Sequence, residues 1–527
     1  MNKIKQSFIH GTIILLAAGI INRILGFVPR ITLPRVIGAE GVGLYQMGYP
    51  LLNILITIIT GGLPLAIAKL VSEAESSGDE QMVRRILRVS LTFVIVGGLC
   101  FSLFCLWIAP YAGTHLMTDR RVIPTIAVMS PIITVVGISS VFRGYFQGRQ
   151  NMIPTAASQI LETIVRIFAM LLFAWFLLPY GVEWAAAGAM AGVLLGEIGG
   201  LIALLMMYRR HHLLSTAPAH AAAHAVPYSR GRHRAAFRKL MQTSIPVTAA
   251  RFVGSGSYLL ESIITVHSLA AAGIATAMAT AQYGALQGMV IPILLLPGVL
   301  TYSLSVSLVP SLSEASARGD MRTIHKRLHQ SMRLALVAGA PFAVIMYLLA
   351  DPLTYYLYAD GSIGHLLRLM APAAIFLYFQ NPLQAALQAL DHPGQALFNS
   401  FAGACVKLTL IVLLAAKLKL GIVGVILAIN VNIVLVSLLH YISVMRTIRF
   451  RLRTADVFMT AGCSAAMGIV MLLARSVLWQ TSGWLNLLAS IGIGLTVYLA
   501  AVFYCGLIDK HDLIRIPWLG PRLRRIK

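Results

Sequence analysis

Long apolar stretches separated by short polar connections recur from one end of the chain to the other. A transmembrane helix needs roughly 20 consecutive, mostly apolar residues, and these stretches are long enough. Because helices satisfy their own backbone hydrogen bonds in lipid, we predict an all-α, polytopic membrane protein. The chain has 527 residues, 11% of them charged, against about a quarter in soluble domains. The fourteen predicted spans cover residues 8–32, 44–69, 89–110, 123–145, 155–178, 184–207, 242–268, 282–309, 333–350, 365–388, 395–416, 420–445, 456–478 and 485–507.

Basic residues are concentrated in alternate connections between these spans. Of the 42 Lys and Arg residues, 30 lie in the N-terminal segment, near the connections after even-numbered spans, or in the C-terminal tail. Seven lie in the connections after odd-numbered spans and five inside spans. Cytoplasmic loops carry the excess of Lys and Arg, so we predict a cell-membrane protein with both termini in the cytoplasm. The net charge of +24 then reflects topology, and we expect no nucleic-acid partner.

Two cytoplasmic connections resemble each other, and their spacing indicates an internal duplication. Residues 72–90 read SEAESSGDEQMVRRILRVS, and residues 313–331 read SEASARGDMRTIHKRLHQS, an offset of 241 residues. Further pairs at this offset are Gly43 with Gly284, Gln46 with Gln287, Gln147 with Gln388 and Arg166 with Lys407. The offset spans six predicted helices, so the halves have the same orientation, as in transporters built from parallel repeats.

The duplication predicts two six-helix lobes with a pathway between them, followed by two additional helices. The predicted parts are an N-lobe at 1–207, a basic linker at 208–240, a C-lobe at 241–446, two helices at 447–508 and a basic tail at 509–527. The tail, which contains Trp518, is expected to lie against anionic lipid headgroups. The five cysteines lie in apolar stretches without metal-type spacing, so we expect no metal and no other cofactor.

Eight charged residues fall inside predicted spans, where each costs roughly 2.5–3.5 kcal/mol at a helix centre. Eight such charges facing lipid would cost on the order of 20 kcal/mol, more than the net stability of most folds. They are therefore expected to face protein or a wet cavity. Five are positive and three negative, and this excess suits an anionic substrate. The eight are Arg23, Arg30, Glu162, Arg166, Glu197, Arg251, Glu261 and Lys407.

Arg23 and Arg30 are seven residues apart, close to two helical turns, so they are predicted to share one helix face. Gly19 and Gly26 lie on that face and are expected to let a neighbouring helix approach closely. Pro29 is expected to kink or open the helix. We predict both arginines as ligands of an anionic substrate. The alternative is that they bond buried carbonyl groups or, for Arg30 especially, reach the outer surface.

Glu162 and Arg166 are four residues apart, so they can pair on one helix face. A structural ion pair and a substrate-binding role are both open for them. In the second half Gly403 replaces the glutamate, whereas Lys407 keeps the positive charge. This retention favours a shared anionic partner for Arg166 and Lys407.

The sequence says less about the role of the remaining charges inside predicted spans. Arg251 and Glu261 are ten residues apart, about 80° around a helix, so we do not expect them to pair. Arg251 is a further substrate-binding candidate, whereas Glu261, together with Glu162, is a candidate for ion coupling or gating. Glu197 lies in the glycine-rich stretch 192–200 and is assigned to helix packing.

Sequence motifs for catalysis are missing from the chain. It contains neither a G-x-x-x-x-G-K-[ST] phosphate-binding loop nor a G-x-S-x-G nucleophile motif. The predicted outer connections are short, so they leave no room for a catalytic domain. We therefore predict that the chain is not an enzyme.

Four segments carry a family resemblance. They are NRILGFVPR at 22–30, RVIGAEGVGLYQM at 35–47, RGYFQGRQNMIPTAASQILETIVRI at 143–167 and LPYGVEWAAAGAM at 178–190. With these segments the chain resembles the multidrug/oligosaccharidyl-lipid/polysaccharide (MOP) flippase superfamily, and within it the branch that serves sporulation. The resemblance implies two lobes around a V-shaped central cavity that opens alternately to the two sides. It also implies transport of a lipid-linked glycan precursor to the outer leaflet, for peptidoglycan of the spore cortex.

The resemblance also bears on the site. Relatives that transport lipid II use first-span arginines in an R-x-L-G-F-x-R pattern for the pyrophosphate; Arg23 matches the first, and Arg30 lies one residue beyond the second. We therefore predict a flippase for an anionic polyprenyl-pyrophosphate-linked glycan, lipid II or a related precursor, with cortex-synthesis enzymes as candidate partners. The further candidate ligands are Arg166, Arg251 and Lys407. Two alternatives stay open: a cation-coupled small-molecule exporter of the same fold, and a non-transporting membrane scaffold for cortex-synthesis enzymes.

Overall fold

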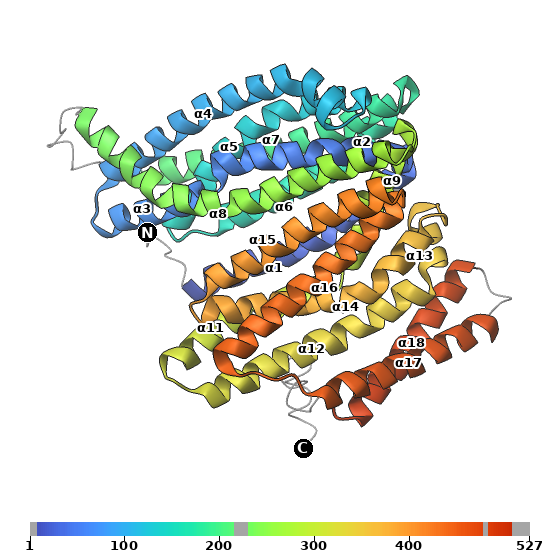
Figure 1. Cartoon of the computed structure of the whole chain (residues 1–527). Coiled ribbons are helices and arrows are strands. Elements are labelled where there is room, and N and C mark those ends of the chain that lie inside the picture. Colours follow the sequence, from blue (N-terminus) through green and yellow to red (C-terminus); the bar gives the residue numbers. More distant parts are fainter. Residues whose placement is uncertain (1–7, 216–229, 478–482, 508–527) are drawn as a thin grey trace. The chain divides into compact units, whose positions relative to one another are not determined.

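The computed structural model describes residues 8–215, 230–477 and 483–507, and every regular element in these ranges is a helix (Figure 1). The predicted all-α fold is therefore confirmed. Eleven helical stretches of the described chain are long and apolar enough to cross a membrane, and one of them, Ala17–Ser76, covers two predicted spans. The prediction of fourteen spans is compatible with these helices. The centre of the predicted linker and the basic tail with Trp518 lie outside the described residues.

The chain forms two compact units, Met1–Met289 and Val290–Lys527, each with its own buried apolar core. The division falls inside the eighth predicted span, and the predicted lobe boundaries stay a prediction. The first unit contains α1 (Phe8–Leu25), α2 (Phe27–Thr60), α3 (Leu63–Ser76), α4 (Glu80–Tyr111), α5 (Ile123–Gly148), α6 (Ile153–Leu177), α7 (Val182–Ser215), α8 (Arg230–Ala271) and α9 (Thr276–Gly284). The second contains α10 (Ile291–Leu295), α11 (Gly298–Ala317), α12 (Met321–Leu348), α13 (Ala350–Tyr358), α14 (Gly364–Ala389), α15 (Pro393–Leu410), α16 (Gly421–Ile448), α17 (Thr454–Val477) and α18 (Gly483–Tyr504).

The first predicted span is interrupted close to its proline. Helix α1 ends just before Gly26 and α2 begins just after it, so the break precedes Pro29 by three residues. Pro29 lies in the first turn of α2, where its missing N–H needs no helical partner. Helix α2 is broken again at Gly38, whose φ of 68° and ψ of 178° suit a residue without a Cβ. This second break separates the first predicted span from the second.

The packing role expected for Gly19 and Gly26 is wrong. A Cβ built on Gly19 would meet no described atom within 4 Å, and one on Gly26 would meet only backbone oxygens of its own helical turn. Close approach occurs instead between α6 and α7. A Cβ on Gly196 would lie 2.7 Å from Arg166 Cβ, and one on Gly200 would lie 3.1 Å from Glu162 Cβ. The glycine-rich face of α7 therefore lets α6 pack closely against it.

The backbone repeats with the predicted offset of 241 residues. Asp79 caps α4 by accepting a hydrogen bond from the Met82 N–H at 2.8 Å, and Asp320 caps α12 in the same way through Thr323 at 3.0 Å. Left-handed residues recur in the same connections, at Gly78 and Gly319, Thr118 and Ala359, and Gln150 and Asp391. These recurrences confirm the internal duplication.

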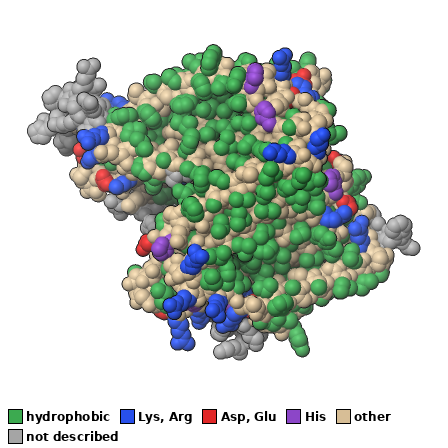
Figure 2. All heavy atoms as spheres, viewed as in Figure 1, with side chains coloured by type: hydrophobic (Ala, Val, Ile, Leu, Met, Phe, Trp, Pro, Cys, Tyr) green, Lys and Arg blue, Asp and Glu red, His purple; other side chains and the backbone are tan. Residues whose placement is uncertain are grey.

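The surface of both units is largely apolar. Figure 2 shows hydrophobic side chains over most of the visible face, with Lys, Arg, Asp and Glu towards its margins. Large apolar side chains such as Trp107, Phe168 and Phe458 are exposed on the helices. So much exposed apolar surface suits contact with lipid.

Candidate functional site

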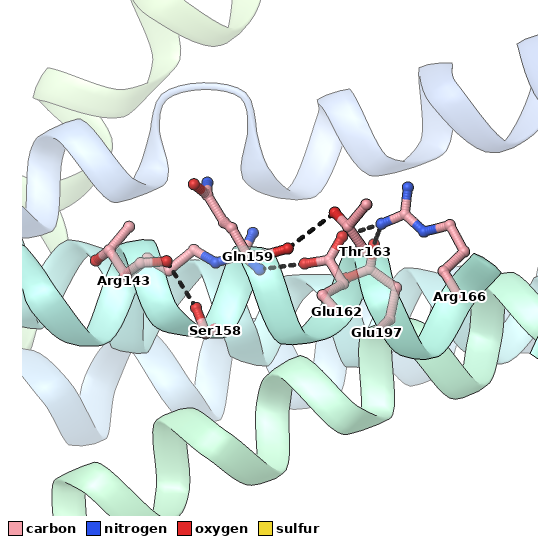
Figure 3. Close-up of polar contacts among 8 residues, drawn as sticks. Arg143, Ser158, Gln159, Glu162, Thr163, Arg166 and Glu197 are labelled. Atoms are coloured by element: carbon pink, nitrogen blue, oxygen red, sulfur yellow. Dashed lines mark hydrogen bonds and ion pairs between the residues drawn. The ribbon is translucent and has the colours of Figure 1, made fainter. Parts of the chain in front are cut away.

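Four charged side chains meet in the first unit, on α5, α6 and α7 (Figure 3). Glu162 bridges two guanidinium groups: Arg143 Nη2 donates to Oε2 at 2.6 Å, and Arg166 Nη2 donates to Oε1. Glu197 Oε1 lies 3.4 Å from Arg166 Nη2. We call Arg143, Glu162, Arg166 and Glu197 the charged cluster. The predicted pairing of Glu162 with Arg166 is confirmed.

The sequence interpretation missed one member of the charged cluster and gave another a different role. Arg143, near the end of the fourth predicted span, is not among the eight charges placed inside spans, whereas Glu197 is. The assignment of Glu197 to helix packing is wrong, because its neighbours Gly196 and Gly200 make the packing contact while its carboxyl group joins the cluster. The glycine-rich stretch around Glu197 could have predicted its position, because a helix face of glycines packs closely and brings a neighbouring polar side chain against the next helix.

Several buried polar atoms of the charged cluster have no hydrogen-bond partner in the described structure. Within the described residues, Glu197 Oε2, Arg143 Nε and Arg166 Nε are buried and have no hydrogen-bond partner. A buried polar atom without a partner costs about 1–3 kcal/mol. Three such atoms lie together in the charged cluster, and a bound group that supplied hydrogen-bond partners would satisfy them.

Tyrosines of α2 extend this polar region towards Arg30. The rings of Tyr45 and Tyr49 lie 6.2 Å apart, one helical turn from each other. Tyr45 lies within electrostatic range of both Arg166 and Arg30. The structure therefore brings two of the predicted substrate ligands to the same part of the first unit.

A third tyrosine connects Arg30 with the buried carboxyl group of α8. Tyr258 lies within electrostatic range of Arg30 and Glu261. Glu261 is buried and accepts a hydrogen bond from Gln287 Nε2 at 3.4 Å. The sequence interpretation selected only charged residues and therefore missed the tyrosines. Tyr45 and Tyr49 are four residues apart, a helical spacing that predicts a shared face.

The other predicted ligands do not belong to the charged cluster, and the structure gives less support for their role. Arg30 is exposed, with its guanidinium 5.6 Å from the centre of the Phe27 ring. Arg23 is half-buried in the last turn of α1, and Gly26, which lies between the two arginines, keeps helical backbone angles of φ −64° and ψ −14°. Arg251 is exposed on α8.

Lys407 lies half-buried on α15 of the second unit. The facing helices α15 and α16 hold a neutral polar group, in which Asn399 Nδ2 donates to His440 Nδ1 at 3.1 Å and to Ser443 Oγ at 2.9 Å. A common anionic partner for Arg166 and Lys407 stays a prediction.

A second charged group, which the sequence interpretation missed, joins the start of α5 to α2 and α9. Arg121 donates to Glu40 at 2.6 Å and to Asp119 at 2.8 Å, and Thr280 Oγ1 donates to Asp119 at 2.8 Å. Asp119 is 3% exposed. Burial alone would raise its pKa, but the hydrogen bonds from Arg121 and Thr280 outweigh burial and hold the pKa of Asp119 below its usual value.

Beside this group, equivalent glycines of the two repeats face each other. A Cβ on Gly284 would lie 2.7 Å from Gly43 Cα, and a Cβ on Gly43 would overlap the backbone of Thr280. The backbones of α2 and α9 are therefore in direct contact. Any larger side chain at either glycine would force these helices apart.

These features define a multi-pass membrane protein built from two repeats, with a polar interior in its first unit. A family model described as "Polysaccharide biosynthesis protein" matches residues 8–316, and one described as "MatE" matches residues 257–413. The chain is 39% identical to Stage V sporulation protein B of Bacillus subtilis (strain 168), over 98% of this chain and 99% of that protein. It is 27% identical to Lipid II flippase MurJ of the same organism, over 97% of this chain and 98% of that protein. The chain thus belongs to the polysaccharide biosynthesis protein family.

Solved structures share the fold. A structure of "Lipid II flippase MurJ, inward closed conformation" covers 94% of this chain and 100% of its own, with a TM-score of 0.69 and 16% identity. An inward-facing multidrug resistance MATE family transporter of the MOP superfamily covers 80% of this chain and 94% of its own, with a TM-score of 0.65 and 13% identity. The predicted fold class is confirmed. The family and the curated relatives place the chain among flippases rather than catalytic enzymes.

Proposed function

We propose that this flippase moves an anionic polyprenyl-pyrophosphate-linked glycan, lipid II or a related precursor for the spore cortex, from the inner to the outer leaflet by alternating access. The observation that carries the proposal is the charged cluster around Arg166, with Arg166 and Arg30 both within electrostatic range of Tyr45 in the first unit. Similarity to proteins named for sporulation and for lipid II supports the substrate class.

Arginines suit a pyrophosphate because the guanidinium group forms paired, charge-assisted hydrogen bonds with phosphate oxygens. Arg30 and Arg166 hold the headgroup in this proposal, and the phenols of Tyr45 and Tyr49 donate further hydrogen bonds. The other proposed ligands are Arg23, Arg251 and Lys407. The polyprenyl chain stays in the bilayer, against the apolar surface of the helices.

The membrane potential supplies a driving force for this direction of transport. An inside-negative potential favours outward movement of negative charge by roughly 2.3 kcal/mol per charge per 100 mV. Glu162 and Glu261 are the candidates for any ion coupling or gating. The proposal includes the topology predicted from the basic loops, with both termini in the cytoplasm.

A second candidate is a cation-coupled exporter of small molecules, favoured by the MatE match and by the buried Glu261. Equilibrium binding to the purified chain separates the two functions. A flippase for anionic precursors binds lipid II more tightly than a neutral glycolipid of equal chain length or a cationic drug. Tighter binding of the cationic drug would overturn the first proposal in favour of the exporter.

A further inference from the structure

The two carboxyl groups of the charged cluster differ in how well they are satisfied. Glu162 receives the close hydrogen bonds of both arginines, whereas Glu197 Oε1 has one contact at 3.4 Å and Oε2 is a buried atom with no partner in the described chain. Glu197 also adjoins the Glu162 carboxylate. Glu197 thus has a single long contact with a donor, where Glu162 has two close ones, so a negative charge on Glu197 is the less well stabilised of the two.

The charged groups that face Glu197 belong to two elements. Helix α6 presents Glu162 and Arg166, and α5 presents Arg143. Tyr45 and Tyr49 of α2 lie within electrostatic range of Arg166. A proton on Glu197 would remove a like charge beside Glu162 and turn an acceptor without a partner into a donor.

We propose that Glu197 binds and releases a proton, and that its protonation makes Arg166 available to an anionic headgroup. With both carboxyl groups ionised, two positive and two negative charges cancel, and two carboxylates compete for Arg166. With Glu197 neutral, the charged cluster carries one net positive charge. Binding of an anion then promotes uptake of the proton, because the linkage between two ligands is reciprocal.

The arginines themselves offer somewhere for an anion to bind. Arg166 Nε and Arg143 Nε are buried donors without partners in the described part of the chain. Each can therefore donate a hydrogen bond to an oxygen of a ligand without breaking an existing one. The second half of this proposal rests on the proposed function, since it names how that site is regulated. The first half, the proton on Glu197, stands independently.

The proton is tested directly by infrared difference spectroscopy of the reconstituted protein, between alkaline and acidic buffer and without substrate. We expect a C=O stretching band of a buried carboxylic acid that appears on acidification and disappears in Glu197→Gln. Glu183→Gln, in the first turn of α7, is the matched control and keeps the band. A band that persists in Glu197→Gln, or no band in the wild type, overturns the assignment.

The link to the anion is tested by measuring the affinity for farnesyl pyrophosphate across pH. From acidic to alkaline buffer, the affinity of the wild type for the probe should fall. We expect this fall to be at least about fivefold larger than the change measured for Glu197→Gln over the same pH range. Ionisation of the probe affects both proteins alike, so their difference reports Glu197. Equal pH profiles in the two proteins would overturn the linkage and leave the proposed function standing. A wild type that does not bind the probe would overturn the anion site and count against the proposed function, while the infrared test still decides the proton.

Discussion

At the scale of single residues, Glu162 organises the charged cluster by accepting hydrogen bonds from Arg143 and Arg166. Its side chain is 10% exposed, so both guanidinium groups depend on it for neutralisation away from water. A buried ion pair adds little net stability, but removal of one partner leaves an uncompensated charge. Sequence spacing was enough to predict the contact with Arg166 and gave no information on the contact with Arg143, which comes from a different helix.

Replacement of Glu162 by Gln is expected to lower the free energy of unfolding by about 3 kcal/mol, because two partly buried guanidinium groups lose their shared carboxylate. The measurement is the midpoint of thermal unfolding in detergent. Glu73→Gln, which changes an exposed carboxyl group on α3, is the control and should leave the midpoint unchanged. Equal midpoints for Glu162→Gln and the wild type would contradict this role.

Asp119 gives a prediction with a definite pH dependence. Its pKa is lower in the folded protein than in the unfolded chain, so its contribution to stability is present above the unfolded pKa of about 3.9. That contribution is lost as the pH falls through the folded pKa. At neutral pH, Asp119→Asn should lower the free energy of unfolding by about 1–3 kcal/mol. The difference from the wild type should shrink in acid, and a difference that grows in acid would refute the account.

At the scale of helices, glycines decide which elements touch. Gly196 and Gly200 let α7 pack closely against α6, and Gly43 and Gly284 let α2 pack closely against α9. The apolar stretches predicted the helices themselves, because length and hydropathy suffice for that. They could not show which glycines face a neighbour: Gly19 and Gly26 had the expected spacing and yet contact no other helix among the described residues.

The glycine face of α7 is tested by comparing two glycine-to-alanine changes. A Cβ at Gly196 would lie 2.7 Å from Arg166 Cβ, whereas a Cβ at Gly97 of α4 meets nothing within 4 Å in the described structure. We expect Gly196→Ala to lower the free energy of unfolding by about 1–3 kcal/mol through overpacking. Gly97→Ala should be neutral or slightly stabilising, because alanine is the better helix former. Equal unfolding midpoints for the two variants would show that α6 and α7 pack less closely than described.

At the scale of the whole molecule, the repeat is regular in its backbone and unequal in its charges. The 241-residue offset predicted turns and caps in both halves, since these depend on local sequence. The charged cluster is not repeated: Gly403 occupies the position of Glu162 and Gln384 that of Arg143, and only Lys407 keeps the charge of its counterpart. The sequence could reveal this asymmetry, but not that Arg143 and Glu197 meet, because that contact depends on three helices packing together. The halves are therefore expected to play different parts in transport.

The central claim is that Arg30 and Arg166 bind an anionic lipid-linked glycan that this flippase moves across the membrane. The most direct measurement reconstitutes the protein with labelled lipid II and scores its appearance in the opposite leaflet. The account predicts transport by the wild type and transport at least about tenfold slower by Arg30→Ala and by Arg166→Ala, since a tenfold loss of affinity corresponds to about 1.4 kcal/mol. Arg84→Ala, which changes an exposed arginine of α4, should transport at the wild-type rate. Wild-type rates in both Arg30→Ala and Arg166→Ala, or no transport by the wild type, would contradict the claim.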